Sequence, residues 1–193
     1  MAGDKYSCSI QGMCGLATGE FHIADQKNME IKLLDNNYKV ISTCDVPENF
    51  QDVCLIGDRE AAVSVNKNIE DRHEIHLFRV RSGTLQKTRS VKLRHECVGL
   101  AHNSGNLYVT TGTQTSLYVY NILSGQGRQL YSHKTRKNIY VDRCAVGPGG
   151  SRAYTTNFSN DQLRIFLTGA EGWGLGCKCF SNNPVFRLFM KSL

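Results

Sequence analysis

The sequence contains no apolar run long enough to cross a lipid bilayer, which excludes a conventional membrane-spanning helix. Its first residues, MAGDKYSCSIQG, lack the basic start and the continuous apolar stretch of a secretory signal peptide. The hydrophobic content of 40% and the mean hydropathy of -0.34 suit a soluble domain. We therefore expect a cytoplasmic protein with no membrane partner.

None of the usual metal-binding C-x-x-C spacings occurs among the eight cysteines. Cys14, Cys54, Cys97 and Cys144 instead recur at or near the start of apolar segments, among Val, Met, Leu and Ala. A free cysteine in such surroundings behaves as a small buried hydrophobe, so we favour free thiols over disulfides or metal ligands. No cofactor and no metal are indicated.

Acidic residues are scarce in the second part of the chain. Residues 1–74 hold 7 Lys and Arg against 13 Asp and Glu, a net charge of -6, and residues 75–193 hold 16 against 4, a net charge of +12. Between Ile75 and Val141 the one acidic residue is Glu96, while the basic residues are Arg79, Arg81, Lys87, Arg89, Lys92, Arg94, Arg128, Lys134, Arg136 and Lys137. This asymmetry fits either an anionic partner or strand edges solvated by Lys and Arg.

A short β pattern begins the ordered part of the sequence. The apolar segments 21–24 and 31–34 flank a polar turn that contains Asp25 and Asn28. Apolar residues that alternate over a few positions on each side of a polar turn indicate an antiparallel pair of strands.

The pattern returns three times. First strands are predicted at 13–16, 53–56, 98–101 and 143–146, second strands at 21–24, 61–65, 107–111 and 153–156, and third strands at 31–34, 74–80, 117–122 and 163–167. A spacing of about 40–46 residues is typical of four-stranded propeller blades. We predict an all-β fold, a β-propeller of about four blades in residues 1–167, with a Gly-rich tail in residues 168–193 that belongs to no blade.

With about four blades, we expect the propeller ring to be incomplete. An open arc leaves two flanks and their strand edges exposed, so we expect self-association through those edges. A closed four-bladed ring is the alternative.

The turn residues resemble a known repeat. Asp25-x-x-Asn28-x-x-Ile31-x-Leu33 resembles the NHL repeat, and Asn157-x-x-Asn160-x-x-Leu163-x-Ile165 repeats the spacing with Asn in place of Asp. Short polar side chains that bond to neighbouring backbone N–H groups explain both.

The segments SCSIQGMCGLATGE, CDVPENFQDVC and HECVGLAHNSGNLYVTTGT resemble the propeller region of the tripartite-motif-like proteins that are abundant in molluscs. The resemblance covers residues 6–167 and implies a six-bladed, NHL-like propeller that serves as a binding module. In that family a RING, a B-box and a coiled coil supply ubiquitin-ligase activity and dimerisation. This sequence has no zinc-spaced Cys/His array and no heptad stretch, so we transfer neither ligase activity nor zinc to it.

The sequence is compatible with three functions. The first is a non-catalytic module that recruits a protein partner through its loops. The second is RNA binding, because Lys134, Arg136 and Lys137 beside Tyr131 and Tyr140 suit a phosphate backbone with stacked bases. The third is a lactonase-like six-bladed enzyme, which needs a central divalent metal, whereas the inner strands offer mainly Val, Ala, Thr, Cys and Tyr. We expect no catalysis.

The candidate binding residues lie in the loops between strands or beside them. They are Asp25, Lys27, Asn28, Lys67, Asn68, Arg72, Gln114, Lys134, Arg136, Lys137, Tyr140, Asn157 and Asn160. We do not expect His73 and His76 to share a metal ion, because residues three apart on a strand point to opposite faces. His95 and Cys97 come without a readable oxyanion hole, so a Cys–His nucleophile is not expected either.

Overall fold

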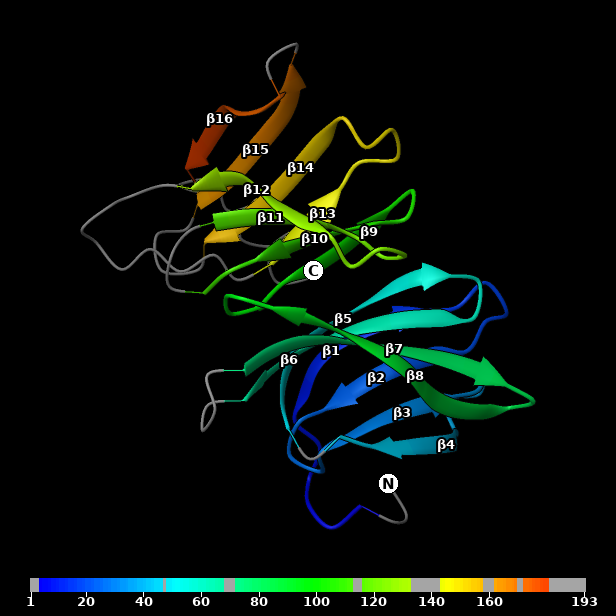
Figure 1. Cartoon of the computed structure of the whole chain (residues 1–193). Coiled ribbons are helices and arrows are strands. Elements are labelled where there is room, and N and C mark those ends of the chain that lie inside the picture. The colour runs from blue at the N-terminus through cyan, green and yellow to red at the C-terminus, as the bar shows by residue number, and fades with distance from the viewer. Residues whose placement is uncertain are drawn as a thin grey trace.

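The regular secondary structure of the described residues consists of β-strands, grouped in four antiparallel sheets of four strands each (Figure 1). The computed structural model describes residues 4–46, 48–67, 72–112, 116–132, 143–157, 162–169 and 172–180. No helix of these residues is long and apolar enough to cross a membrane.

Each sheet is one repeat of the sequence, and we call the sheets blades 1 to 4. Blade 1 contains β1 (Ile10–Gly15), β2 (Phe21–Asp25), β3 (Glu30–Leu34) and β4 (Val40–Asp45). Blade 2 contains β5 (Asn49–Gly57), β6 (Glu60–Lys67), β7 (Arg72–Arg81) and β8 (Thr84–Leu93). Blade 3 contains β9 (Leu100–Asn103), β10 (Asn106–Thr110), β11 (Ser116–Asn121) and β12 (Gly127–Ser132). Blade 4 contains β13 (Cys144–Val146), β14 (Arg152–Asn157), β15 (Gln162–Gly169) and β16 (Gly172–Phe180).

The predicted first, second and third strands are all confirmed, with ends that move by a few residues. The burial of the strands explains their composition. In β6 the residues Ala61–Asn66 are all buried because blade 2 is covered on both faces, and such strands read as continuous rather than alternating apolar runs. The outer strand β8 has buried Leu85, Val91 and Leu93 among exposed polar residues, since it lies at the edge of its sheet.

Apolar side chains join successive blades. Within the described ranges, one cluster that includes Leu33 and Phe78 lies between blades 1 and 2, and another that includes Leu77 and Leu107 lies between blades 2 and 3. A third, smaller cluster contains Tyr108 of blade 3 and Ala153 of blade 4. No corresponding cluster of described residues joins blade 4 to blade 1. The four blades therefore pack in series, as in part of a ring.

The last sheet extends beyond the predicted boundary at Leu167. β15 ends at Gly169, and β16 (Gly172–Phe180) pairs with it along its length, so this part of the predicted tail is the fourth strand of blade 4. The physical reason is visible in the sequence, because Trp173, Leu175, Cys177 and Cys179 alternate with Gly or Lys, a period of two that suits a strand. Residues 181–193 lie outside the described residues.

The six cysteines whose side chains are described are free thiols, as expected: Cys8, Cys14, Cys44, Cys54, Cys97 and Cys144. Cys97 is buried, whereas Cys14, Cys54 and Cys144 are half-buried rather than fully enclosed. Burial raises the pKa of the Cys14 and Cys97 thiols to about 12, so both are protonated at neutral pH.

Candidate functional site

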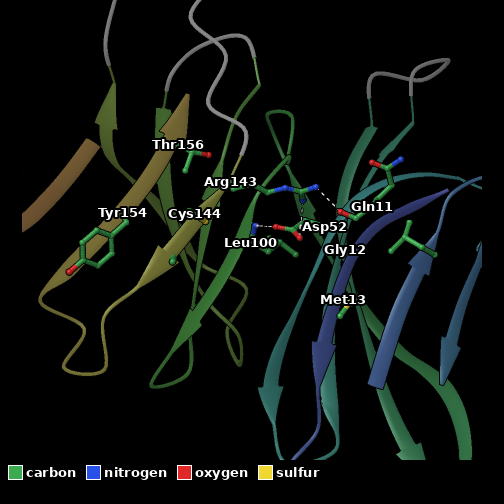
Figure 2. Close-up of a pocket in the computed structure, with 11 residues that line it drawn as sticks. Gln11, Gly12, Met13, Asp52, Leu100, Arg143, Cys144, Tyr154 and Thr156 are labelled. Atoms are coloured by element: carbon green, nitrogen blue, oxygen red, sulfur yellow. Dashed lines mark hydrogen bonds and ion pairs between the residues drawn. The ribbon is translucent and has the colours of Figure 1, made fainter. Parts of the chain in front are cut away.

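A pocket of about 510 Å³ opens among the inner strands of the four blades (Figure 2). We call it the axial pocket. Its lining comes from residues far apart in sequence: Ile10, Gln11, Gly12 and Met13 of blade 1, Asp52 of blade 2, Leu100 of blade 3, and Arg143, Cys144, Ala145, Tyr154 and Thr156 at blade 4.

Asp52 is the polar centre of the pocket. Its Oδ2 atom accepts a hydrogen bond from the backbone N–H of Leu100 at 2.9 Å, and its Oδ1 atom accepts one from the N–H of Val53 at 2.9 Å. Arg143 forms an ion pair with Oδ1 at 2.9 Å. Burial raises the pKa of Asp52, and the charge of Arg143 opposes this rise. One carboxylate thus connects blades 2, 3 and 4.

Arg143 crosses the pocket. Its Nη1 atom donates to the carbonyl oxygen of Gln51 at 2.8 Å, and its Nη2 atom donates to that of Gln11 at 2.6 Å. The guanidinium therefore connects the start of blade 4 with the inner strands of blades 1 and 2. A planar group with several N–H donors suits this task better than an ammonium would.

Gly12 permits the close approach of blades 1 and 2. A Cβ atom at this position would lie 2.9 Å from Oδ1 of Asp52 and 3.0 Å from the backbone nitrogen of Val53. The pairing of β1 with β2 also shifts register between Ile10 and Gly12. A glycine beside such an irregularity allows two backbones to come together.

The wall beside these polar groups is apolar and open. The side chains of Met13 and Ile10 are 63% and 45% exposed, whereas Leu100 behind them is buried. Cys144 donates to the carbonyl oxygen of Tyr108 at 3.4 Å, and burial raises its thiol pKa well above the ordinary value. A protonated thiol is a poor nucleophile. The pocket thus combines fixed polar groups with exposed apolar surface, which suits binding.

Two solved structures resemble the fold of this chain over most of its length. The β-propeller domain of Cps50 (Swd1) from Myceliophteria thermophila has a TM-score of 0.66 at 13% identity, over 90% of this chain and 59% of that one. The fold is a β-propeller. A protein of unknown function from Bacteroides caccae has a TM-score of 0.69 at 12% identity, over 92% of this chain and 63% of that one.

This chain therefore spans about three fifths of the propeller domain and of the Bacteroides protein. At this level of identity the likeness concerns the fold alone. A scan of protein-family models finds no match, and a search of the curated proteins finds none either.

The predicted Asp–Asn pair occupies the β2–β3 end of the first propeller blade. Asn28 donates to Oδ2 of Asp25 at 2.8 Å, and Oδ1 of Asp25 accepts from the backbone N–H of Ser9 at 2.9 Å. Asn28 also accepts from the N–H of Tyr6 at 3.0 Å. The pair does bond to backbone N–H groups, but these belong to residues 16 and 22 positions away and not to the turn itself, so the bonds hold the segment before β1 in place. Lys27 donates to Ser7 in the same segment at 3.2 Å.

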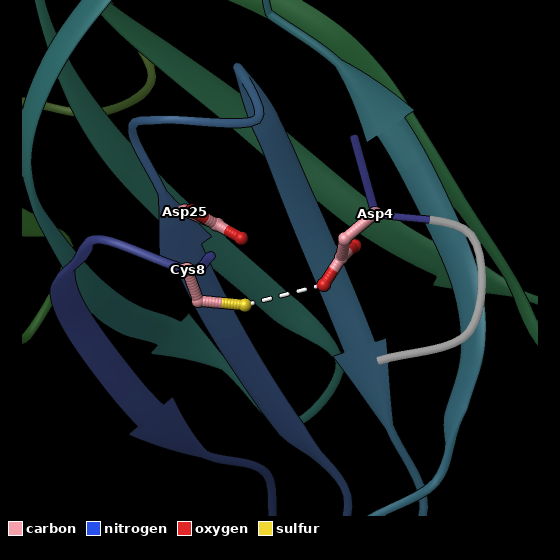
Figure 3. Close-up of side chains that lie close together, drawn as sticks. All are labelled: Asp4, Cys8 and Asp25. Carbon is pink, nitrogen blue, oxygen red and sulfur yellow. Dashed lines mark hydrogen bonds between the residues drawn. The ribbon is translucent and has the colours of Figure 1, made fainter. Parts of the chain in front are cut away.

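Asp25 belongs to a buried ionic group with Lys32, and Figure 3 shows Asp25 beside Asp4 and Cys8. Nζ of Lys32 lies 2.7 Å from Asp25 and 2.5 Å from Asp4, and its side chain is 1% exposed. Burial opposes ionisation of Asp25, but hydrogen bonds from Lys32 and others outweigh it and lower the pKa of Asp25.

Asp4, Cys8 and Asp25 have ligand atoms close enough together to hold a metal ion. The ammonium group of Lys32 already supplies the cation at this place, because it contacts both carboxylates. The group therefore fits a lysine rather than a metal.

The other described candidates are not part of the lining of the axial pocket, although Asn157 directly follows the lining residue Thr156. Lys67 pairs with Glu48, Arg72 pairs with Glu74 at 3.3 Å, and Asn157 is the last residue of β14. No described candidate lines the pocket. Asn68, Gln114, Lys134, Arg136, Lys137, Tyr140 and Asn160 lie outside the described residues.

Part of the basic stretch is occupied by contacts within the propeller. Arg79 pairs with Glu60, and Arg89 donates to the carbonyl oxygen of Leu123 at 3.2 Å. Nζ of Lys87 lies 3.2 Å from Nε2 of His76. His76 in turn lies 2.9 Å from Glu74, and His73 contacts Asn66, so the two histidines have separate partners.

Sequence reasoning missed Gly12, Asp52 and Arg143, which organise the pocket. One signal was present, because two opposite charges stand at the start of predicted first strands: Asp52 directly precedes segment 53–56, and Arg143 begins segment 143–146. A charge beside an inner strand needs a partner, and the inner strands converge on the propeller axis.

Proposed function

We propose that this chain is a non-catalytic interaction module that recruits a protein partner to its axial pocket. The observation that carries the proposal is the exposure of Met13 and Ile10, at 63% and 45%, beside the fixed polar pair Asp52 and Arg143. Exposed apolar side chains next to oriented polar groups are typical of a binding surface. The partner would cover Met13 and Ile10.

The proposal includes an NHL-like identity for the repeat. It is supported by the repeat spacing of about 40–46 residues and by the hydrogen bond of 2.8 Å between Asn28 and Asp25 at the predicted turn. The tripartite-motif-like resemblance then suggests substrate recruitment as the role.

An enzymatic role receives no support from the described pocket. Its one carboxylate, Asp52, is paired with Arg143 and hydrogen-bonded to two N–H groups, and its one thiol is protonated. A lactonase-like reaction needs several carboxylate or amide ligands around a metal ion.

The test compares two exposed apolar residues. Met13→Asp places a charge in the pocket, whereas Leu123→Asp makes the same kind of change at a side chain that is 84% exposed in the β11–β12 turn. Proteins cross-linked to the wild-type chain in cells would be identified, purified and titrated against each variant. We expect one partner to lose at least about tenfold in affinity to Met13→Asp and to bind Leu123→Asp normally.

RNA recognition is an outcome of the same experiment. Short single-stranded RNAs would be titrated at low and moderate salt beside an Arg136→Glu/Lys137→Glu variant. Selective RNA binding that survives moderate salt and is lost in that variant would replace the proposal of a protein partner. Equal binding of the protein partner by Met13→Asp and Leu123→Asp would place its site elsewhere.

A further inference from the structure

β1 presents a strand edge to the axial pocket. The sheet order in blade 1 is β1-β2-β3-β4, so among the described strands β1 has a hydrogen-bonded neighbour on one side alone. Its residues Ile10–Met13 line the pocket, and Figure 2 shows β1 facing β13 across it. Unpaired strand edges offer N–H and C=O groups to another extended chain.

The register shows which backbone groups point to the pocket. The N–H of Leu16 donates to the carbonyl oxygen of Glu20 on the β2 side at 2.7 Å. Successive residues of an antiparallel strand direct their N–H and C=O groups to opposite sides, so Met13 and Gly15 direct theirs away from β2. The alternation breaks at Gln11, where the register shifts, but its carbonyl oxygen also faces the pocket, because it accepts from Arg143 at 2.6 Å.

The side chains at this edge leave room for an added chain. Met13 is 63% exposed, and Gly15 is exposed and has no side chain. The register shift places Ile10 opposite Asp25 and Met13 opposite Ile23, two residues apart on β2, so Ile10 and Met13 share a face although they are three apart in sequence. A peptide on this edge would place alternate side chains against both.

The charge that a partner meets at the pocket is positive. The side chain of Arg143 is 41% exposed, whereas that of Asp52, its ion-pair partner, is 13% exposed. A guanidinium that is already oriented by carbonyl oxygens can bind a further carboxylate through its other N–H groups. Charge complementarity therefore favours an acidic segment.

We propose that the axial pocket binds an extended peptide segment that adds to the free edge of β1, with apolar side chains on Met13 and Ile10 and a carboxylate on Arg143. The proposal rests on the proposed function and specifies the chemistry of its partner. Main-chain hydrogen bonds to Met13 and Gly15 would give affinity, and the pocket and Arg143 would give specificity.

Two variants of one residue separate strand addition from side-chain contact. Met13→Pro removes an N–H group that faces the pocket and preserves the ladder between β1 and β2, because Met13 directs its N–H away from β2. Met13→Leu keeps the N–H group and a similar apolar volume. Their unfolding curves would show that both fold.

The probe is a phage-displayed library of random linear peptides of about twelve residues, selected on the wild-type chain. We expect the enriched peptides to alternate apolar residues and to contain Asp or Glu. A synthetic enriched peptide should lose at least about tenfold in affinity to Met13→Pro and less than about twofold to Met13→Leu. Peptide binding should also slow hydrogen exchange at the amides of Met13 and Gly15.

Several results would overturn the proposal. They are a lack of enrichment over a Met13→Asp control, unchanged binding by Met13→Pro, and unchanged amide exchange at Met13 and Gly15. A dimer of this chain that Met13→Pro abolishes would assign the edge to a second copy instead. If a cellular partner no longer binds the Met13→Asp variant but still binds the Met13→Pro variant, the result supports recruitment to the pocket and contradicts strand addition.

Discussion

Asp52 and Leu100 are joined by a hydrogen bond of 2.9 Å, which the backbone N–H of Leu100 in blade 3 donates to the side chain of Asp52 in blade 2. The same carboxylate pairs with Arg143 of blade 4 at 2.9 Å. Apolar clusters hold neighbouring blades face to face, whereas this carboxylate fixes the inner strands relative to one another. The shape of the axial pocket therefore depends on Asp52 together with Arg143 and Gly12.

Asp52→Asn should destabilise the chain by about 1–3 kcal/mol, because it leaves the partly buried Arg143 without its counter-charge. Urea unfolding measures this change in the free energy of unfolding. Asp58→Asn, which removes the same charge from the exposed β5–β6 turn, is the matched control and should change stability by less than about 0.5 kcal/mol. Equal effects in the two variants would contradict the central role of Asp52.

Gly12→Ala should destabilise the chain by about 1–3 kcal/mol, because the added Cβ atom overpacks the contact with Asp52 and Val53. Gly15→Ala on the same strand is the control, since its Cβ atom would lie 3.5 Å from Phe21, an ordinary contact. Thermal unfolding of the two variants gives the comparison. A Gly12→Ala variant as stable as Gly15→Ala would show that β1 can move away from β5 without cost.

Acid should destabilise the propeller through His22. This side chain is 0% exposed, neither ring nitrogen has a hydrogen-bond partner within the described residues, and burial lowers its pKa from 6.5 to about 4. Between these two values the unfolded chain binds more protons than the folded chain, so stability is full above pH 6.5 and is lost as the pH falls toward 4.

The loss attributable to His22 should reach about 3 kcal/mol near pH 4. Replacement by a residue that does not titrate, His22→Leu, should flatten the dependence of unfolding free energy on pH in this window. Urea unfolding at a series of pH values gives both curves. Parallel curves for the wild type and His22→Leu would mean that another group controls the acid response.

Lys32→Met should destabilise the chain by about 3–5 kcal/mol, because it leaves Asp25 buried without its cation. Lys39→Met is the control: it removes an exposed lysine from the turn before β4 and should change the free energy of unfolding little. Chemical unfolding of each variant provides the measurement. Adding Asp25→Asn to Lys32→Met should recover part of the loss, and a double variant no more stable than the single one would argue against the ion pair as the cause.

The strands and their repeat were predictable because their information is local. Alternating apolar residues around Phe21 and Ile31 specify a hairpin without reference to the remainder of the chain. That Asp25 and Asn28 share one turn was likewise predictable, since they are three apart, whereas their bonds to the N–H groups of Ser9 and Tyr6, 16 and 22 residues away, were not. β16 was missed because its glycines obscured the alternation of Trp173, Leu175, Cys177 and Cys179.

The axial pocket could not be predicted in the same way. Arg143 contacts Gln51 and Gln11 across 92 and 132 residues of sequence. These contacts depend on how each blade turns relative to the one before, which packing among the blades decides. Position 12 likewise requires a small residue because Asp52, which belongs to another blade, lies against it.

The bond from Arg143 to Gln11 also orders events during synthesis on the ribosome. Blade 1 emerges first and can form its hairpins from local contacts, but its inner edge meets Arg143 after another 132 residues have been made. During that interval the edge of β1, with Met13 beside it, is open to any extended chain nearby. The contact between blade 1 and Arg143 can therefore form only after the start of blade 4 has been synthesised.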